Sequence, residues 1–519
     1  MKKYILTTCL LALGVAMQAQ DTYFNNQLTN TSGDVYGSAR FVGMGGAMGA
    51  LGADISTISW NPAGIGLMRK SNVAFTAGAA WSKKGIEEKS TTNATLDQFG
   101  IVYNVEIDED VPYLNIGFNY QKKLDFNGGF YADNPNLGGL SQMDILAQTA
   151  NLGYDTNDNL AGMAVDNLFL SALDKDGNLI LNDKTPIDRY VNRYKGLSNN
   201  YTQYSSGSLN AFDINISGNY RDRFFFGLTF GVDNLRYRGW NDYFEVSRNA
   251  EGVAGDYSVY NDHAIDGNGF NVKVGFIYRP IEDNPLRVAL AAETPTWYQF
   301  KRSNLYSMTD HIGNYSTNEY ESYLEYSVRT PFKFRAGVGS TVGNYLAWDI
   351  DYEFANYRYT AMGYPDTYVD DPNSSLFNNT WDKEMNRQTK ANMKPAHNVR
   401  AGIEFKPTKS LALRAGYNFA TSPYEDKISM DQVEIDSYSM NKATTTSLMR
   451  LGDIHSLTLG LGYSWKYGYV DLAYKTKMQK GDFYAFDAAS ASNGSVRSLT
   501  PVNTELTRSQ ITATLGFKF

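Results

Sequence analysis

Alternation of apolar and polar residues is the dominant pattern in this sequence, and it is clearest over residues 511–519 at the C-terminal end. Ile511, Leu515 and Phe517 share one face of that stretch, whereas the positions between them are polar, small or charged. A period of two residues is typical of a β-strand with one apolar face. A shift of one residue would place Lys518 among the apolar side chains, so the pattern also determines which face is apolar.

Similar stretches recur in pairs separated by short turns, and each pair predicts a β-hairpin. The predicted hairpins occupy residues 208–239, 268–296, 330–360, 397–420 and 454–475, and three further strands precede them at 73–81, 99–103 and 114–120. Together with the final strand they make fourteen.

The connections between these strands alternate between short and long along the chain. Long ones fall near residues 82–96, 122–207, 240–267, 297–329, 361–395, 422–453 and 481–505. Bacterial transmembrane barrels have an even number of strands, short turns at one end and long loops at the other. We therefore predict an all-β fold, a transmembrane antiparallel β-barrel of about fourteen strands over residues 72–519, with its longest external loop at 122–207. A soluble sandwich or propeller is the alternative, since its strands also alternate.

The first residues have the pattern of a secretory signal peptide. Lys2 and Lys3 precede an apolar core over residues 4–17, and Ala19 provides a small residue at a cleavage point, so we assign residues 1–19 to the signal. The only cysteine, Cys9, lies in that core, so the mature chain has no thiol for a disulfide or a metal. We expect export to the outer membrane of a Gram-negative bacterium.

Composition agrees with a barrel and excludes other classes. Aromatic residues make up 14% of the 519 residues, and the formal net charge is −8, which gives no basic footprint for nucleic acid. No apolar run after the signal approaches the roughly 20 residues that a membrane-spanning helix needs.

A barrel of fourteen strands would leave an open lumen unless something filled it. Residues 20–71 precede the first strand, lack its alternation and are rich in glycine over residues 43–53, so we predict that they form a plug. The glycine run is not a dinucleotide fingerprint, because Met48 stands where the third glycine would be required.

The N-terminal segment also resembles a known family. The run 43–47, then Ala53-Asp54, then Asn61, Pro62, Ala63 and Gly64 before the first strand look like the hatch of the FadL/TodX transporters of fatty acids and other hydrophobic compounds. Residues 275–280 and 413–419 are similar to strands of that family, and the final Phe519 resembles the aromatic residue that outer-membrane assembly machinery recognises.

The resemblance implies a plugged barrel that captures a fatty-acid-like compound outside the cell and releases it sideways into the membrane by passive diffusion. It implies that Asn61, Pro62, Ala63 and Gly64 shape the hatch and do no chemistry. The loop 122–207 and a third-strand kink that the sequence does not locate depart from the family pattern. Barrels of this shape also serve protein secretion or surface display, as in PorV-like proteins, and haem uptake, and these functions remain alternatives.

Candidate ligand contacts fall in three places: the predicted plug, the long loop and the inward face of the strands. They are Met44, Met48, Leu140, Met143, Leu146, Phe169, Arg335 and Arg414. The apolar residues of the loop are typical either of a lid that takes up hydrophobic ligands or of a loop with its own small core. The arginines either bind a carboxylate or take part in ion pairs that brace the lumen, and we favour the ion pairs.

The sequence gives no sign of catalysis or of a cofactor. No Gly-x-Ser-x-Gly motif is present, and His263, His311, His397 and His455 are dispersed, so no catalytic, cofactor or metal residue is assigned. The expected partners are the lipid bilayer, a hydrophobic small molecule and, during insertion, the barrel-assembly machinery. We expect a monomer.

Overall fold

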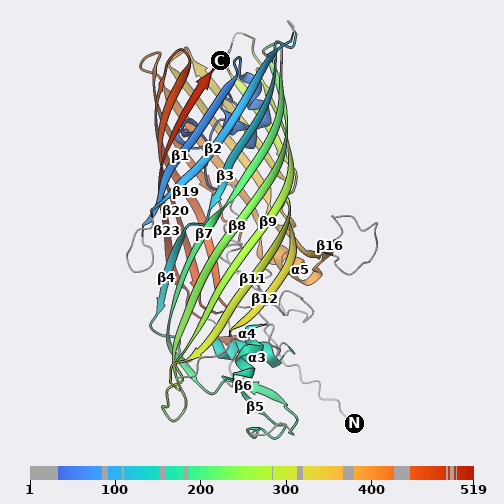
Figure 1. Ribbon diagram of the computed structural model, residues 1–519, viewed down its shortest axis with the longest axis vertical. Coiled ribbons are helices and arrows are strands. Elements are labelled where there is room, and N and C mark those ends of the chain that lie inside the picture. The colour runs from blue at the N-terminus through green and yellow to red at the C-terminus, as the bar shows by residue number, and fades with distance from the viewer. Residues whose placement is uncertain are drawn as a thin grey trace.

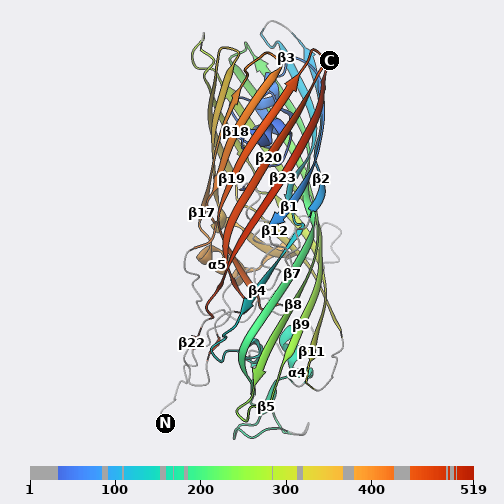
Figure 2. The same cartoon turned by 90° about the vertical axis from the view of Figure 1, so that its left-hand side faces the viewer.

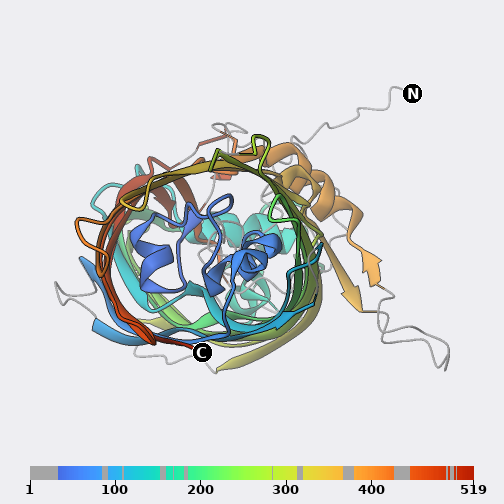
Figure 3. The same cartoon turned by 90° about the horizontal axis from the view of Figure 1, so that it is seen from above.

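The computed structural model describes residues 33–83, 92–107, 110–151, 153, 159–167, 169–180, 185–282, 284–312, 319–365, 379–425, 445–486, 489–490, 496–497 and 499–519. The predicted signal peptide, residues 1–19, lies outside these ranges. The chain forms a closed antiparallel barrel of fourteen strands, as predicted, and the N-terminal segment lies inside it (Figure 3).

Four of the fourteen barrel strands are built from two consecutive pieces, β3 with β4, β10 with β11, β12 with β13, and β14 with β15, and the short β16 pairs with β15 as an addition to the fourteen. The strands of the main sheet are β1 (Asn72–Lys83), β2 (Thr92–Glu106), β3 (Tyr113–Asp125), β4 (Gly128–Asn134), β7 (Lys195–Tyr220), β8 (Phe224–Arg248), β9 (Tyr257–Tyr278), β10 (Arg287–Glu293), β11 (Trp297–Asp310), β12 (Tyr320–Arg329), β13 (Lys333–Val342), β14 (Leu346–Asn356), β15 (Ala361–Pro365), β16 (Asn379–Trp381), β17 (Pro395–Phe405), β18 (Leu411–Ala420), β19 (Leu448–Ser464), β20 (Gly468–Tyr484) and β23 (Val502–Lys518).

Short helices and small two-stranded sheets accompany the barrel. They are α2 (Ala39–Gly43), η2 (Ile55–Ser59), η3 (Pro62–Leu67), α3 (Gln142–Asn151), α4 (Leu160–Asp166), β5 (Ser171–Leu173), β6 (Arg189–Val191), η5 (Tyr357–Tyr359), α5 (Lys383–Asn392), β21 (Ala489–Ser490) and β22 (Val496–Arg497). In the described part of the chain no helix has the length and apolar character needed to cross a membrane.

The barrel closes where β23 pairs with β1, from Asn72 opposite Lys518 to Lys83 opposite Thr507. The predicted faces of β23 are confirmed, because Leu515 and Phe517 are exposed on the outside whereas Gln510 and Thr512 are buried inside. Lys518 belongs to the inward series but lies exposed at the rim, with its ammonium over the Tyr469 ring.

The two ends of the barrel differ. At one end, short turns join the strands, and β23 terminates there. We call this end the turn end, and it is uppermost in Figures 1 and 2. The other, the loop end, carries the long connections and the helices α3 and α4 (Figure 1). Both helices belong to the long loop 122–207.

The predicted loops 240–267 and 297–329 are wrong, because strands fill most of both. β8 continues to Arg248, β9 starts at Tyr257, and β11 and β12 occupy much of the second segment. The lipid-facing alternation stops near Val232, and the next outward residues of β8, Asn234, Arg236 and Arg238, are polar, which hides the strand from a search for apolar alternation. On this side of the barrel β8, β9 and β11 therefore reach far towards the loop end (Figure 1).

The N-terminal segment packs so closely on the wall that glycine is required at the contact. A Cβ added to Gly416 of β18 would lie 2.2 Å from the backbone nitrogen of Gly45 and 2.3 Å from the carbonyl carbon of Met44. Neither backbone atom can move without displacing the N-terminal segment. The absence of a side chain at Gly416 therefore allows the segment to pack against β18.

We predict that Gly416→Ala lowers the stability of the folded barrel by about 1–3 kcal/mol, because overpacking forces backbone shifts. The temperature at which the barrel loses its heat-modifiable migration in detergent measures the effect. Gly128→Ala in β4 is the control, since a Cβ there meets no atom within 4 Å. An equal shift in both variants would show that close packing at Gly416 is unimportant.

Candidate functional site

Two carboxylates of β14 hold the N-terminal segment in the lumen. Asp351 accepts hydrogen bonds from the backbone N–H groups of Met48 and Gly49 at 3.1 and 2.8 Å. Asp349 accepts those of Ala50 and Leu51 at 3.0 and 2.6 Å. Four consecutive N–H groups thus point at two acidic side chains, which is the arrangement by which backbone concavities bind anions.

This contact explains the glycine-rich run that invites a phosphate-loop interpretation. A Cβ at Gly49 would lie 2.3 Å from a carboxylate oxygen of Asp351, so a side chain there would block the approach. The anion that these backbone groups bind is therefore part of the barrel wall itself.

The motif Asn61, Pro62, Ala63 and Gly64 forms hydrogen bonds within the N-terminal segment and with the barrel wall. The Asn61 amide donates to the carbonyl of Gly49 at 2.8 Å, and its oxygen accepts the N–H of Ala63. The Pro62 carbonyl accepts a hydrogen bond of 2.6 Å from the Ser217 hydroxyl of β7. These contacts are structural, and the role that the resemblance implies for the motif stays a prediction.

Trp60 lies between two arginines of the wall. The guanidinium carbons of Arg335 and Arg400 lie 4.4 and 3.5 Å from its ring centroid. The indole N–H donates to Asp351 at 2.9 Å, and Arg335 donates to the Trp60 carbonyl. Cations over an aromatic face are attracted more strongly where water is excluded.

The inward charges form ion pairs across neighbouring strands. Arg335 lies 2.6 Å from both Glu293 and Glu353. Arg414 likewise lies 2.6 Å from both Glu404 and Asp471. Further inward charges lie in the same buried or half-buried lining. They are Lys273, Arg287, Lys333, Asp349, Asp351, Arg400 and Lys475. Arg335 and Arg414 therefore have carboxylate partners already within the wall, and their role as ligand contacts stays a prediction.

The apolar candidates separate into two groups at opposite ends of the lumen. Leu140, Met143, Leu146 and Phe169 come together around α3 and α4, where they pack on inward side chains of the wall at the loop end. Met44 and Met48 belong to a different cluster, within the N-terminal segment. The loop thus has no separate core, because its apolar residues share one with the barrel wall.

Glu245, near the loop end of β8, attaches α3 to the wall. Its carboxylate accepts the backbone N–H of Gln142 at 3.0 Å and the hydroxyls of Tyr243 and Tyr257. The residue lies far beyond Val232, the last lipid-exposed apolar position of its strand. Burial raises the pKa of Glu245 to about 7, although hydrogen bonds from its neighbours oppose the shift.

A second apolar cluster, which we call the mid-lumen cluster, lies between the N-terminal segment and the lid formed by α3 and α4. Its members are buried side chains from six wall strands, β15 and α5. They are Leu124, Phe126, Leu209, Leu235, Tyr237, Ile265, Tyr298, Phe300, Leu324, Tyr326, Val328, Met362 and Met385. Sequence reasoning missed it, because a polar lumen is the usual expectation for such barrels. The signal was present in Leu235, Tyr237 and Ile265, which continue the inward series of β8 and β9.

The third barrel strand breaks beside this cluster. The strand changes from β3 to β4 around Phe126, and its register against β7 slips between Lys122 and Leu124. β2 pairs with β3 only from Gln98 to Glu106, so the rest of β2 has a partner on one side alone. The wall therefore has a notch between β2 and β3.

Phe126 and Arg508 face the inner side of this notch. The Phe126 ring meets that of Tyr237 edge-on, with centroids 5.1 Å apart. Arg508 of β23 donates to the carbonyls of Asp125 and Asn127 at 3.1 and 2.9 Å, so it binds the backbone on both sides of Phe126.

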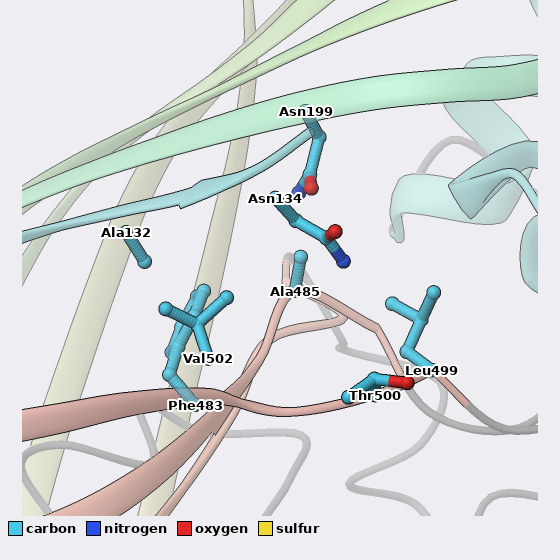
Figure 4. Close-up of a pocket in the computed structure, with 8 residues that line it drawn as sticks. All are labelled: Ala132, Asn134, Asn199, Phe483, Ala485, Leu499, Thr500 and Val502. Atoms are coloured by element: carbon cyan, nitrogen blue, oxygen red, sulfur yellow. The ribbon is translucent and has the colours of Figure 1, made fainter. Parts of the chain in front are cut away.

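A small cavity lies further towards the loop end, where β4 approaches β20 and β23 (Figure 4). Ala132, Asn134, Asn199, Phe483, Ala485, Leu499, Thr500 and Val502 line it. Its empty volume is about 210 Å³ including its open mouth, and its walls are mainly apolar. Phe483 also stacks near Phe130 and Tyr201, so the cavity borders the lid cluster.

The four histidines are dispersed, as predicted. His263 is buried in the lumen, and His311 contacts Ser258. His397 and His455 lie on the outer surface, each hydrogen-bonded to a tyrosine. Within the described ranges no three His, Cys, Asp or Glu side chains are grouped so that they could hold a metal ion.

We predict that Asp349→Ala combined with Asp351→Ala loosens the N-terminal segment, because a buried N–H left without an acceptor costs about 1–3 kcal/mol. Ion conductance of the purified protein in planar bilayers should rise. Asp110→Ala is the control, since Asp110 forms an exposed pair with Arg221. Conductance equal to that of the control would contradict this anchoring.

We predict that docking of the lid weakens as the pH rises from 4.5, the ordinary pKa of a glutamate, towards 7. Docked Glu245 binds its proton more tightly than an exposed glutamate does, so protonation favours the docked state. Limited proteolysis within residues 137–191 should therefore be faster at pH 8 than at pH 5. Glu245→Gln should remove this dependence, and an unchanged profile in that variant would contradict the assignment.

Comparison with known proteins supports the architecture. No family model and no curated protein matches the sequence. A Pseudomonas aeruginosa FadL homologue is similar in structure, with a TM-score of 0.53 and 12% identity over 93% of this chain and 98% of the other. The toluene transporter TodX of Pseudomonas putida matches over 93% of this chain and 99% of its own, with a TM-score of 0.46 and 12% identity. The toluene transporter TbuX of Ralstonia pickettii matches over 93% of this chain and 98% of its own, with a TM-score of 0.44 and 14% identity. The chain thus has the fold of a FadL homologue, as the resemblance of its N-terminal residues indicates.

Proposed function

We propose that this protein takes up hydrophobic small molecules across the outer membrane by passive diffusion through a plugged barrel. The observation that carries the proposal is the mid-lumen cluster, an apolar and aromatic lining between the lid and the N-terminal segment. Apolar and aromatic side chains in the lumen offer an apolar compound a surface that a lumen filled with ion pairs does not. An apolar compound loses its unfavourable contact with water in such a lining.

Uptake starts at the lid. Leu140, Met143, Leu146 and Phe169 provide an adaptable apolar surface at the loop end, which we place outside the cell. The ligand passes from this cluster to the mid-lumen cluster when the lid moves. The other candidate contacts lie off this route. Met44 and Met48 belong to the plug, and Arg335 and Arg414 belong to the ion pairs of the wall around it.

The exit is the notch between β2 and β3. Phe126 belongs to the mid-lumen cluster and stands at the break of the third strand, so the cluster leads to the notch. Irregular backbone at membrane depth is tolerated only where protein covers it, as Arg508 covers the carbonyls of Asp125 and Asn127. We infer that the ligand leaves sideways into the bilayer there.

The remaining parts fit the same function. Residues 20–71 act as the hatch that prevents leakage, and Asn61, Pro62, Ala63 and Gly64 shape it. Residues 1–19 direct export, the final strand ending in Phe519 is read by the barrel-assembly machinery, and the barrel of residues 72–519 works as a monomer. The ligand is fatty-acid-like, and the protein performs no enzymatic reaction.

We predict that Leu209→Asn combined with Ile265→Asn slows uptake at least about tenfold, because an amide in an apolar lining opposes passage by about 1–3 kcal/mol. The assay uses cells whose outer membrane excludes N-phenylnaphthylamine and a fluorescent dodecanoic acid. Expression of the wild-type protein should accelerate the appearance of fluorescence for both probes.

Ser456→Asn is the matched control, since Ser456 of β19 faces the lumen outside the mid-lumen cluster. Uptake of hydrophilic nitrocefin in the same cells reports leakage past the hatch and should not change. Failure of the wild-type protein to accelerate either hydrophobic probe would overturn the proposal. Stable co-purification of a secreted protein with no uptake would instead favour a secretion barrel.

A further inference from the structure

Beyond the lipid-facing surface, the outer face of β7, β8, β9, β11 and β12 carries successive rows of residues of different chemical character. The last apolar row, in strand register, consists of Phe212, Val232, Phe270 and Trp297, which are 39–50% exposed. The rows that follow towards the loop end change character together on neighbouring strands, so the bands cross from strand to strand and do not belong to one strand.

An amide row comes directly after the apolar row. Asn210, Asn234, Asn268 and Gln299 lie side by side in register, and Asn234 donates to Asn268 at 2.9 Å. Amides are short polar groups that both donate and accept hydrogen bonds. This row marks the boundary between hydrocarbon and polar surroundings.

A charged row follows, with Arg236, Asp266, Lys301 and Glu325 in register. Lys301 pairs with Glu325 at 2.9 Å, and Arg238 of the next row pairs with Asp266 at 2.7 Å. Among the described residues Arg236 is exposed and has no carboxylate partner. Counted together with Arg238, the charged row has three cations against two carboxylates, an excess of one positive charge.

An aromatic ladder lies beyond the charges. The rings of Tyr204, Trp240 and Tyr260 stack across β7, β8 and β9, with consecutive centroids 6.4 Å apart and interplanar angles of 29° and 24°. Tyr260 is 37% exposed, and Asp242 and Asp262 flank it on the same outer face. An aromatic face beside acceptors is suited to a ring that has both C–H groups and hydroxyls, as a sugar has.

The heights of the bands match those of one type of lipid. A strand rises about 3.4 Å per residue, and at a tilt of about 40° Arg236 of β8 stands roughly 10 Å above Val232 of the same strand, and Trp240 roughly 20 Å above it. Phosphates attached directly above acyl chains occupy the first height, and sugars attached to them occupy the second.

We propose that this outer wall binds a phosphorylated glycolipid of the outer leaflet, with phosphate at Arg236 and Arg238 and saccharide on Tyr204, Trp240 and Tyr260. Guanidinium groups bind phosphate through paired hydrogen bonds. The proposal is continuous with the lipid-facing surface and explains why the wall extends so far on this side. It rests on the outer-membrane location within the proposed function, and not on uptake.

Native mass spectrometry of the purified protein tests the assignment with three probes, lipid A, lipopolysaccharide bearing core sugars, and phosphatidylglycerol. Arg236→Ala combined with Arg238→Ala should weaken binding of lipid A and of the lipopolysaccharide roughly 25-fold, since each basic residue near a membrane contributes about a factor of five. Trp240→Ala combined with Tyr260→Ala should weaken binding of the lipopolysaccharide alone.

Tyr463→Ala combined with Tyr467→Ala is the matched control, because both tyrosines are exposed at the turn end. Heat-modifiable migration in detergent verifies that every variant is folded. The proposal is wrong if the arginine pair affects phosphatidylglycerol as strongly as lipid A, or if the aromatic pair behaves like the control. Uptake of the hydrophobic probes is measured separately, so its loss with retained glycolipid binding would overturn only the transport function.

Discussion

The hydrogen bonds between two carboxylates of β14 and the backbone of the N-terminal segment are the contact on which the rest of the structure depends. A barrel of fourteen strands has a lumen wide enough to leak, so its contents must be fixed to the wall. Asp349 and Asp351 receive the N–H groups of residues 48–51, and Asp351 also receives that of Trp60. Buried carboxylates are stable only with such partners, so the wall needs the segment as much as the segment needs the wall.

The lumen is layered, and the layers separate two tasks. Ion pairs and hydrogen bonds dominate around the N-terminal segment at the turn end, where Arg335 and Arg414 bridge acids on neighbouring strands. Apolar and aromatic side chains dominate beyond it, in the mid-lumen cluster and the lid. In the proposed function, the charged layers hold the N-terminal segment rigidly and exclude a hydrophobic compound, whereas the apolar layers accept one. The break in the third strand lies where the apolar layers meet the wall.

The limits of prediction follow from what each residue faces. The strand order and closure were predictable because lipid imposes an apolar outer face on every strand, as at Leu515 and Phe517. The extensions of β8, β9, β11 and β12 were not, since outward residues such as Arg236 and Asp266 face polar surroundings and carry no apolar period. The grouping of Leu140 and Phe169 with the barrel was also hidden, because it joins residues far apart in the sequence.

The sequence by itself determined the barrel, its fourteen strands, the inward charges and the glycine-rich segment before the first strand. These features follow from the local alternation of apolar and polar residues and from the small size of single residues, such as Gly49, which leave room for a close contact. Only the tertiary structure decided that Asp349 and Asp351 bind that segment, that an apolar cluster fills the middle of the lumen, and that the wall is notched beside Phe126. Each of these depends on which strands become neighbours, and alternation specifies the face of a strand but not what lies opposite it.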